Sequence, residues 1–224
     1  MTEGLMRAQG VQQGAFITLE GPDGCGKSTQ ARMLAEALSK DSTEVLSIRE
    51  PGGTDISERI RKLLLDPANS SMSAECELLL YEASRAQLVN QVIKPACARN
   101  AIVICDRFYD STYAYQAGAR GLDKGMVAWA NTLGSCGCVP IRTILLDLEP
   151  SIAFRRAAKE GTPDRLEAEG LCFQERVRAA YLELAQREPE RICVVDASGS
   201  PEMVHDRIIE ALGDLNLPFA AGVS

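Results

Sequence analysis

A short run of small residues ending in a lysine and a serine is the first sign of chemistry in this chain. Residues 21–28 read GPDGCGKS, so four residues separate Gly21 from the triplet Gly26-Lys27-Ser28. Glycines let a loop curl until successive N–H groups point at phosphate oxygens, and a helix beginning there adds the positive end of its dipole. In such loops the lysine reaches the outer phosphates and the hydroxyl holds Mg²⁺. The run therefore predicts a phosphate-binding loop with a metal ligand at Ser28.

Asp106 and Arg107 form a second candidate pair, at the end of an apolar run. A carboxylate in this position can orient Mg²⁺ or its waters next to a guanidinium that grips phosphate. Taken alone, the pair could equally be a surface ion pair. A phosphate-binding loop at the same edge of a sheet favours the functional interpretation, with Asp106 as a second metal ligand.

Five short apolar runs are typical of buried strands, and helical stretches separate them. The runs are residues 15–20, 45–49, 102–106, 143–148 and 192–196. This alternation predicts an α/β fold of three layers, in which a central five-stranded parallel sheet is flanked by helices and ligands bind at the carboxyl ends of the strands. Helices are expected at 27–40, 73–98 and 167–187, and another after Ser200 as N-cap. The strand before the loop and the helix after it argue against a glycine-rich turn without function.

Composition and length are those of one globular domain. The 224 residues are 46% hydrophobic and 25% charged; we expect a flexible extension at 1–14, a single domain at 15–215 and a tail at 216–224. The formal charge of −7 argues against a broad basic surface for nucleic acid and favours a small anion in a cleft. Glycines and a proline break the longest uncharged stretch, 125–141, and residues 1–14 lack an apolar signal core. A cytoplasmic location away from membranes is therefore expected.

The eight cysteines show no paired C-x-x-C framework, which favours free thiols. Cys25 lies inside the phosphate-binding loop, where the polarity of the helix end could lower the pKa of the thiol and make it sensitive to oxidation. The close pair Cys136 and Cys138 would need further ligands to hold a metal.

Residues 103–116, VICDRFYDSTYAYQ, resemble the signature of thymidylate kinases. Four more segments fit that family in order: EGPDGCGKSTQ from residue 20, REPGGT from 49, LLLYEASRAQLV from 78 and VVDASGSPEMV from 194. The resemblance covers residues 15–212, and REPGGT is typical of the bacterial branch. It implies a phosphate-binding-loop (P-loop NTPase) nucleoside monophosphate kinase fold with a mobile lid at about 155–169, and a homodimer. It also implies transfer of the γ-phosphoryl group of ATP to dTMP with Mg²⁺, giving dTDP, a step in dTTP synthesis for DNA replication.

The resemblance also assigns roles to the residues around the two phosphates. Asp23 is similar to the family's carboxylate near the acceptor sugar and phosphate, although it could instead stabilise the loop by accepting local N–H groups. Arg107 and Arg61 are similar to the arginines that grip the acceptor phosphate, and Arg61 alone would also suit a solvated helix face. The ATP-binding residues implied are Gly21, Pro22, Asp23, Gly24, Cys25, Gly26, Lys27, Ser28 and Thr29. The dTMP-binding residues implied are Asp23, Glu50, Pro51, Arg61, Tyr81, Arg85, Arg107, Ser111, Thr112, Tyr115 and Gln116.

Base and sugar recognition follows from the same resemblance. Tyr81 and Arg85 stand four apart on one helix face and are similar to the ring that stacks on thymine and the arginine that bonds its O4; without the family, packing would be the usual interpretation. Thr112 and Gln116 align with residues that bond the base edge. Tyr115 aligns with the ring that crowds the sugar's 2′ position and so favours deoxyribose.

The stretch from Arg155 to Arg165 resembles the family's lid. Because the loop carries Gly24 where one branch has an arginine, catalytic charge is expected from the lid, with Arg165 as first candidate and Arg156 next. Together with Asp23, Lys27 and Arg107 these are the predicted catalytic residues. A charged, solvated helix end is the alternative for any single lid arginine. The adenine pocket is expected at the loop 197–201.

Two other functions share part of this pattern. A deoxynucleoside kinase or another monophosphate kinase has the same loop and strand-end Asp-Arg pair, but a nucleoside acceptor needs a general base, whereas an acceptor phosphate needs mainly positioning. A nucleotide-gated binding module would leave the acceptor motifs without a purpose. The small-molecule partners expected are ATP and dTMP, with Mg²⁺ as cofactor.

Overall fold

Five parallel strands form the centre of the fold, in the order β2-β3-β1-β4-β5. The computed structural model describes residues 14–39, 43–157, 165–215 and 217–219. The strands are β1 Phe16–Glu20, β2 Val45–Arg49, β3 Ile102–Asp106, β4 Arg142–Asp147 and β5 Ile192–Asp196. The predicted α/β fold with a five-stranded parallel sheet is confirmed, and each strand lies within one residue of its predicted bounds.

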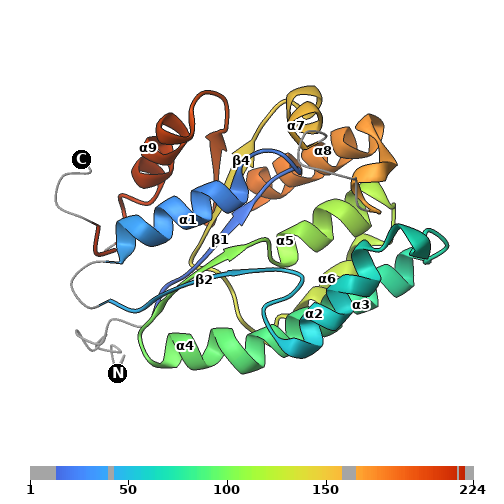
Figure 1. The fold of residues 1–224 in the computed structure, drawn as a ribbon, viewed down its shortest axis with the longest axis horizontal. Coiled ribbons are helices and arrows are strands. Elements are labelled where there is room, and N and C mark those ends of the chain that lie inside the picture. The colour runs from blue at the N-terminus through green and yellow to red at the C-terminus, as the bar shows by residue number, and fades with distance from the viewer. Residues whose placement is uncertain (1–13, 40–42, 158–164, 216, 220–224) are drawn as a thin grey trace, which may run out of the picture.

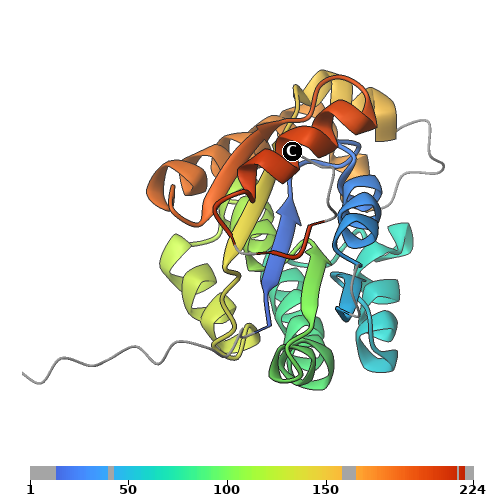
Figure 2. The same ribbon diagram turned by 90° about the vertical axis from the view of Figure 1, so that its left-hand side faces the viewer.

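Helices cover both faces of this sheet (Figures 1 and 2). They are α1 Lys27–Leu38, α2 Asp55–Leu65, α3 Ala74–Leu88, α4 Lys94–Ala98, α5 Tyr109–Thr112, α6 Lys124–Gly134, α7 Pro150–Ala157, α8 Leu171–Arg187 and α9 Pro201–Ala211. Short 3₁₀ turns occupy Pro67–Asn69 and Glu167–Glu169, while π-helical turns at Val89–Ile93 and Tyr113–Ala119 follow α3 and α5. Helices α1 and α9 pack on one face of the sheet, and helices α4, α5 and α8 pack on the other face.

The helix predictions hold apart from two bounds. Helix α1, predicted over 27–40, ends at Leu38 with Ser39 as its C-cap. The expected helix over 73–98 is continuous, because the π turn joins α3 to α4. Ser200 caps α9 as expected, and its side chain accepts from the Met203 N–H. The helix expected from residue 167 instead begins at Leu171, because Gly170 has φ 84° and ψ −179°, which no helix accommodates.

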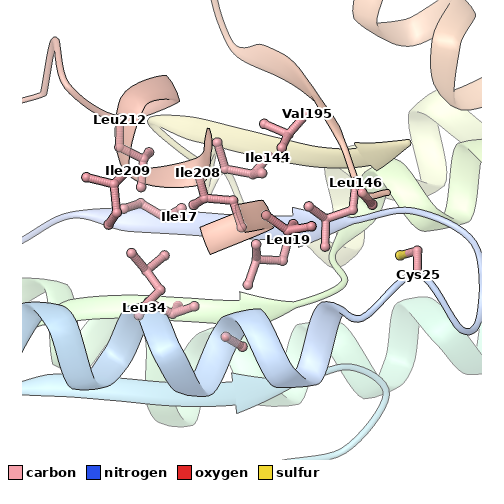
Figure 3. Close-up of a cluster of buried hydrophobic side chains, with 14 of the residues drawn as sticks. Ile17, Leu19, Cys25, Leu34, Ile144, Leu146, Val195, Ile208, Ile209 and Leu212 are labelled. Carbon is pink, nitrogen blue, oxygen red and sulfur yellow. The ribbon is translucent and has the colours of Figure 1, made fainter. Parts of the chain in front are cut away.

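The main hydrophobic core lies between the sheet and helices α1 and α9 (Figure 3). Ile17 and Leu19 of β1 meet Leu34 of α1 and Ile208 of α9 there, all with no exposed surface. Leu217 and Phe219 also pack against this cluster, so the packed chain continues past the predicted end of the domain at residue 215. Complete burial of β1 explains its largely apolar sequence and makes its carboxyl end a rigid support for the loop that follows.

None of the helices in the described ranges combines the length and apolar character that a membrane crossing requires.

Candidate active site

The phosphate-binding loop connects β1 to α1 at the carboxyl edge of the sheet (Figure 1). Gly26 caps α1 with φ 98°, a left-handed conformation in which a side chain would be strained. Gly21 has φ 140°, and a Cβ there would lie 2.5 Å from the carbonyl oxygen of Leu146 in β4. Lys27 is buried, and its Nζ donates to the Pro22 carbonyl across the loop at 2.8 Å. The glycines thus permit the tight loop that the sequence predicts.

Ser28 and Asp106 meet at the adjacent ends of α1 and β3. The Ser28 hydroxyl donates to Asp106 Oδ2 at 2.6 Å, although 78 residues separate them. Among the described residues, no group of three or more His, Cys, Asp or Glu side chains could hold a metal ion. The pair nonetheless fits Mg²⁺ bound with a nucleotide, because that ion takes one or two protein oxygens and completes its shell with phosphate and water.

Arg107 follows β3 in a left-handed backbone conformation, with φ 73°. This conformation costs a non-glycine residue about 1 kcal/mol, so the surrounding contacts must hold it. Two hydrogen bonds do so: the Arg107 N–H donates to the Leu19 carbonyl at 2.9 Å, and the Phe108 N–H donates to Glu20 Oε1 at 2.6 Å. Glu20, the last residue of β1, therefore aims Arg107 back toward the phosphate-binding loop.

The guanidinium of Arg107 is held from several sides. It donates to Asp23 Oδ1 at 2.5 Å, to the hydroxyls of Tyr115 and Ser111 at 3.1 Å, to the Tyr181 hydroxyl at 3.3 Å and to the Gly21 carbonyl. Burial alone would raise the pKa of Asp23, but the positive charges of Arg107 and Lys27 and the hydrogen bond from Tyr115 outweigh it and hold that pKa below its usual range. Asp23 is thus an ionised partner of Arg107, inside the loop.

Glu20 is a fully buried carboxyl that sequence reasoning missed. Besides Phe108 N–H, it accepts from the Ser111 and Tyr181 hydroxyls at 2.6 and 2.7 Å. Burial, with the nearby charge of Asp110, raises the pKa of Glu20 to about 7 against the opposing effect of Arg107. The carboxyl connects β1, α5 and α8 beneath Arg107.

Arg85 of α3 lies inside the protein between two carboxylates. Its Nε donates to Glu50 Oε2 at 2.8 Å and its Nη1 to Glu82 Oε1 at 2.5 Å, while Nη2 donates to the Thr112 hydroxyl at 2.9 Å. The guanidinium also lies over the Phe108 ring, 5.3 Å from its centroid. These four contacts fix the orientation of the guanidinium, which offers only hydrogen-bond donors to its surroundings.

A cavity of about 250 Å³ lies between the phosphate-binding loop and α3. Every predicted dTMP-binding residue lines it: Asp23, Glu50, Pro51, Arg61, Tyr81, Arg85, Arg107, Ser111, Thr112, Tyr115 and Gln116. Of the predicted ATP-binding residues, Asp23, Gly24, Gly26, Lys27, Ser28 and Thr29 line it too, together with Asp106. The lining residues that sequence reasoning missed are Arg49, Leu65, Phe108 and Leu166. Arg49 lies in the REPGGT segment, so that motif could have identified it.

The lid predicted at about 155–169 is only partly described, because residues 158–164 lie outside the described ranges. Arg155 and Arg156 are exposed in the last turn of α7. Arg165, the first catalytic candidate, is buried; its Nη1 pairs with Glu77 at 2.5 Å and its Nε donates to the Leu64 carbonyl. It therefore points toward α2 and α3 in this structure.

Cys25 corrects a sequence prediction. Its side chain lies at the loop end of the main core (Figure 3) and is 2% exposed. Burial raises the pKa of the thiol, outweighing the opposing charges of Lys27 and Arg107. The expectation of a lowered pKa is therefore wrong, because the thiol points into the core rather than along the polar helix end. All eight cysteines are free, as predicted.

The fold and this cavity define a phosphate-binding-loop nucleotide kinase. A family model described as Thymidylate kinase matches residues 19–208. The thymidylate kinase of Pseudomonas putida strain GB-1 is 50% identical over 199 residues, covering 89% of this chain and 94% of the relative. That of Desulfosudis oleivorans is 47% identical over 213 residues, 91% of this chain and 100% of the relative. The crystal structure of thymidylate kinase from Ehrlichia chaffeensis has a TM-score of 0.74 and 32% identity, covering 89% of this chain and 98% of its own. The chain belongs to the thymidylate kinase family, ATP:dTMP phosphotransferases that convert dTMP to dTDP.

Proposed function

We propose that the described cavity is where this thymidylate kinase joins its two substrates. The supporting observation is that every predicted dTMP-binding residue lines the same cavity as Lys27 and Ser28. The acceptor phosphate binds at Arg107 and Arg61, and the base lies deeper, against Tyr81 and Arg85. This order places the acceptor phosphate beside the loop that holds the ATP phosphates.

The residues act mainly by positioning. An acceptor phosphate is already an anionic nucleophile, so the site needs no general base. Two phosphate groups repel each other, and the fixed guanidinium of Arg107 with the ammonium of Lys27 offsets both that repulsion and the charge of the transition state. Asp23 holds Arg107 in place and faces the acceptor rather than the donor, because an anion among the donors to ATP would repel its phosphates.

Mg²⁺ is the proposed cofactor, held by the Ser28 hydroxyl and the Asp106 carboxylate. Both are hard oxygen ligands of the kind this ion selects. When bound with ATP, the ion neutralises charge on the β- and γ-phosphate oxygens. The lid arginines Arg156 and Arg165 remain proposed sources of further positive charge; Arg165 would first have to leave Glu77.

A homodimer is proposed through helices α2, α3 and α6, which lie side by side (Figure 1). Large apolar side chains are exposed on all three: Ile56, Leu63, Leu79, Met126, Trp129 and Leu133. Trp129 is 69% and Leu79 66% exposed, and a second copy of this chain would cover such a surface. Light scattering on the full chain tests this proposal. The Trp129→Glu variant should be a monomer, whereas the control variant Met203→Glu, at an exposed position on α9, should remain a dimer. A wild-type monomer at working concentration contradicts the dimer.

The activity itself is tested by ADP release with Mg-ATP and each of dTMP, dUMP, dCMP, dAMP, dGMP, UMP and thymidine. Turnover is expected to favour dTMP strongly and to be lost with Arg107→Ala. Turnover of thymidine instead of dTMP would assign a nucleoside kinase, and binding of ATP without acceptor-dependent turnover would assign a binding module.

A further inference from the structure

Gln116 and its neighbour Glu77 form a buried pair at the base end of the cavity. Gln116 lines the cavity. Gln116 and Glu77 are each 1% exposed. The Gln116 Nε2 donates to Glu77 Oε1 at 2.7 Å. A carboxylate only accepts hydrogen bonds, so it dictates which end of the carboxamide turns toward it: the NH₂ group faces Glu77, and the carbonyl oxygen is left for the cavity.

Glu77 is itself held firmly and kept ionised. Arg120 donates to both of its oxygens, from Nε at 3.2 Å and Nη2 at 3.1 Å, and Arg165 pairs with Oε2 at 2.5 Å. The carboxylate also lies in the first turn of α3, where the helix dipole favours a negative charge. Although burial alone would raise the pKa of Glu77, hydrogen bonds from Arg120 and Gln116 and the charges of both arginines hold it below its usual range. Glu77 therefore remains an obligate acceptor.

We propose that Glu77 is a positioning residue that fixes the carboxamide of Gln116 with its oxygen toward the base, so that the cavity selects a pyrimidine carrying an N3–H group. This inference rests on the proposed placement of dTMP. Thymine and uracil present N3–H as a donor and O4 as an acceptor; cytosine presents a bare N3 acceptor and an N4 amino donor. The Gln116 carbonyl oxygen can accept the N3–H of thymine or uracil. With cytosine, the same oxygen would face the bare N3, so that two acceptors would oppose each other.

Arg85 complements this selection from the neighbouring helix face. Its guanidinium has only donors and is fixed by Glu50, Glu82 and Thr112. The acceptor of Gln116 and the donor of Arg85 together complement the N3–H donor and the O4 acceptor of the base. A base with the wrong edge would leave buried polar groups of the site without hydrogen-bond partners, and this costs binding free energy.

The experiment compares dTMP with 5-methyl-dCMP, which differ only at N3 and C4 of the base. In Glu77→Gln the residue at 77 can donate as well as accept, so the Gln116 carboxamide is free to turn. We expect the kcat/KM ratio of dTMP to 5-methyl-dCMP to fall by about tenfold or more, with a rise in absolute turnover of 5-methyl-dCMP. A parallel loss for both substrates with an unchanged ratio would show a structural role only and overturn the proposal.

Arg120→Gln is the matched control. It removes one guanidinium from the same carboxylate but leaves the hydrogen bond between Glu77 and Gln116, so the ratio should not change. If this variant lowers the ratio as much as Glu77→Gln does, general loosening explains the effect and the orientation mechanism is wrong.

The exchanged double variant, Glu77→Gln with Gln116→Glu, provides a second test that does not depend on the single variant folding. It keeps one carboxylate in the pair and again presents only acceptors to the base, so preference for dTMP should return to near the wild-type ratio. Loss of preference in the folded double variant contradicts the proposal. Absence of dTMP turnover in the wild-type protein would instead refute the proposed function.

Discussion

Glu20 is a buried carboxyl whose titration should be visible in the stability of the protein. Its pKa is about 7 in the folded state against 4.5 ordinarily, so between these values the folded protein holds a proton that the unfolded chain has lost. Unfolding releases that proton, and the free energy of unfolding therefore falls as pH rises. The full shift corresponds to about 3 kcal/mol, of which about 2 kcal/mol falls between roughly pH 5 and pH 7.5.

Glu20→Gln removes this titration while keeping the shape of the side chain. Its carbonyl can still accept from Phe108 N–H, and its NH₂ can donate to the Ser111 and Tyr181 hydroxyls, which rotate to accept. Relative to wild type, the variant should therefore gain about 2 kcal/mol in free energy of unfolding between pH 5 and pH 7.5. Urea unfolding at three pH values measures both curves. The control is Glu36→Gln, an exposed carboxylate, whose curve should run parallel to wild type. Parallel curves for Glu20→Gln would refute the assignment of a raised pKa.

Three further outcomes follow from the described contacts. Tyr115→Ala should raise the ratio of UMP to dUMP turnover by about tenfold, because it removes the ring predicted to crowd the 2′ position; an unchanged ratio assigns sugar selection elsewhere. Gly134→Ala should lower stability by about 1–3 kcal/mol in thermal unfolding, because its Cβ would lie 1.8 Å from Glu82 Oε2, which is buried beside Arg85. A disulfide reagent should modify Cys25 at least about tenfold more slowly than the exposed Cys172, because the Cys25 thiol is buried and its pKa is raised. The two rates are obtained by comparing the wild-type protein with the Cys25→Ser and Cys172→Ser variants. Fast, ATP-protected modification of Cys25 would contradict that reasoning.

The strands could be predicted closely because the central ones, β1, β3 and β4, are largely buried in a parallel sheet and are rich in apolar residues. The cavity residues could be placed together because they follow strands that end at one edge, and because Tyr81 and Arg85 share a helix face. The lower accuracy at α8 has a local cause: Gly170 adopts a positive φ that nothing in the surrounding helical pattern indicates.

The supporting residues could not be predicted, because their roles arise from contacts between distant parts of the chain. Glu20 meets Tyr181 across 161 residues, and the sequence around either shows only an acid ending a strand and an aromatic in an amphipathic helix. The sequence predicts Arg165 as the first candidate for catalytic charge from the lid, but the orientation of its side chain depends on Glu77. In the sequence, that carboxylate looks like any solvated acid in the first turn of a helix. A pattern can place a residue on a face, but the partner that captures its charge depends on the packed fold.

The way Arg107 is held has a consequence for the thermodynamics of substrate capture. A free arginine side chain has about 2 kcal/mol of rotamer entropy to lose when it is immobilised. In this chain that loss occurs on folding, because the left-handed turn and the contacts to Asp23, Tyr115 and Ser111 already fix the guanidinium. A phosphate that binds at Arg107, as proposed, would therefore meet a cation that needs no further ordering, and more of its interaction energy would remain as affinity. The strain at one backbone residue is thus a cost met during folding, and under the proposed binding mode it would make each later binding event more favourable.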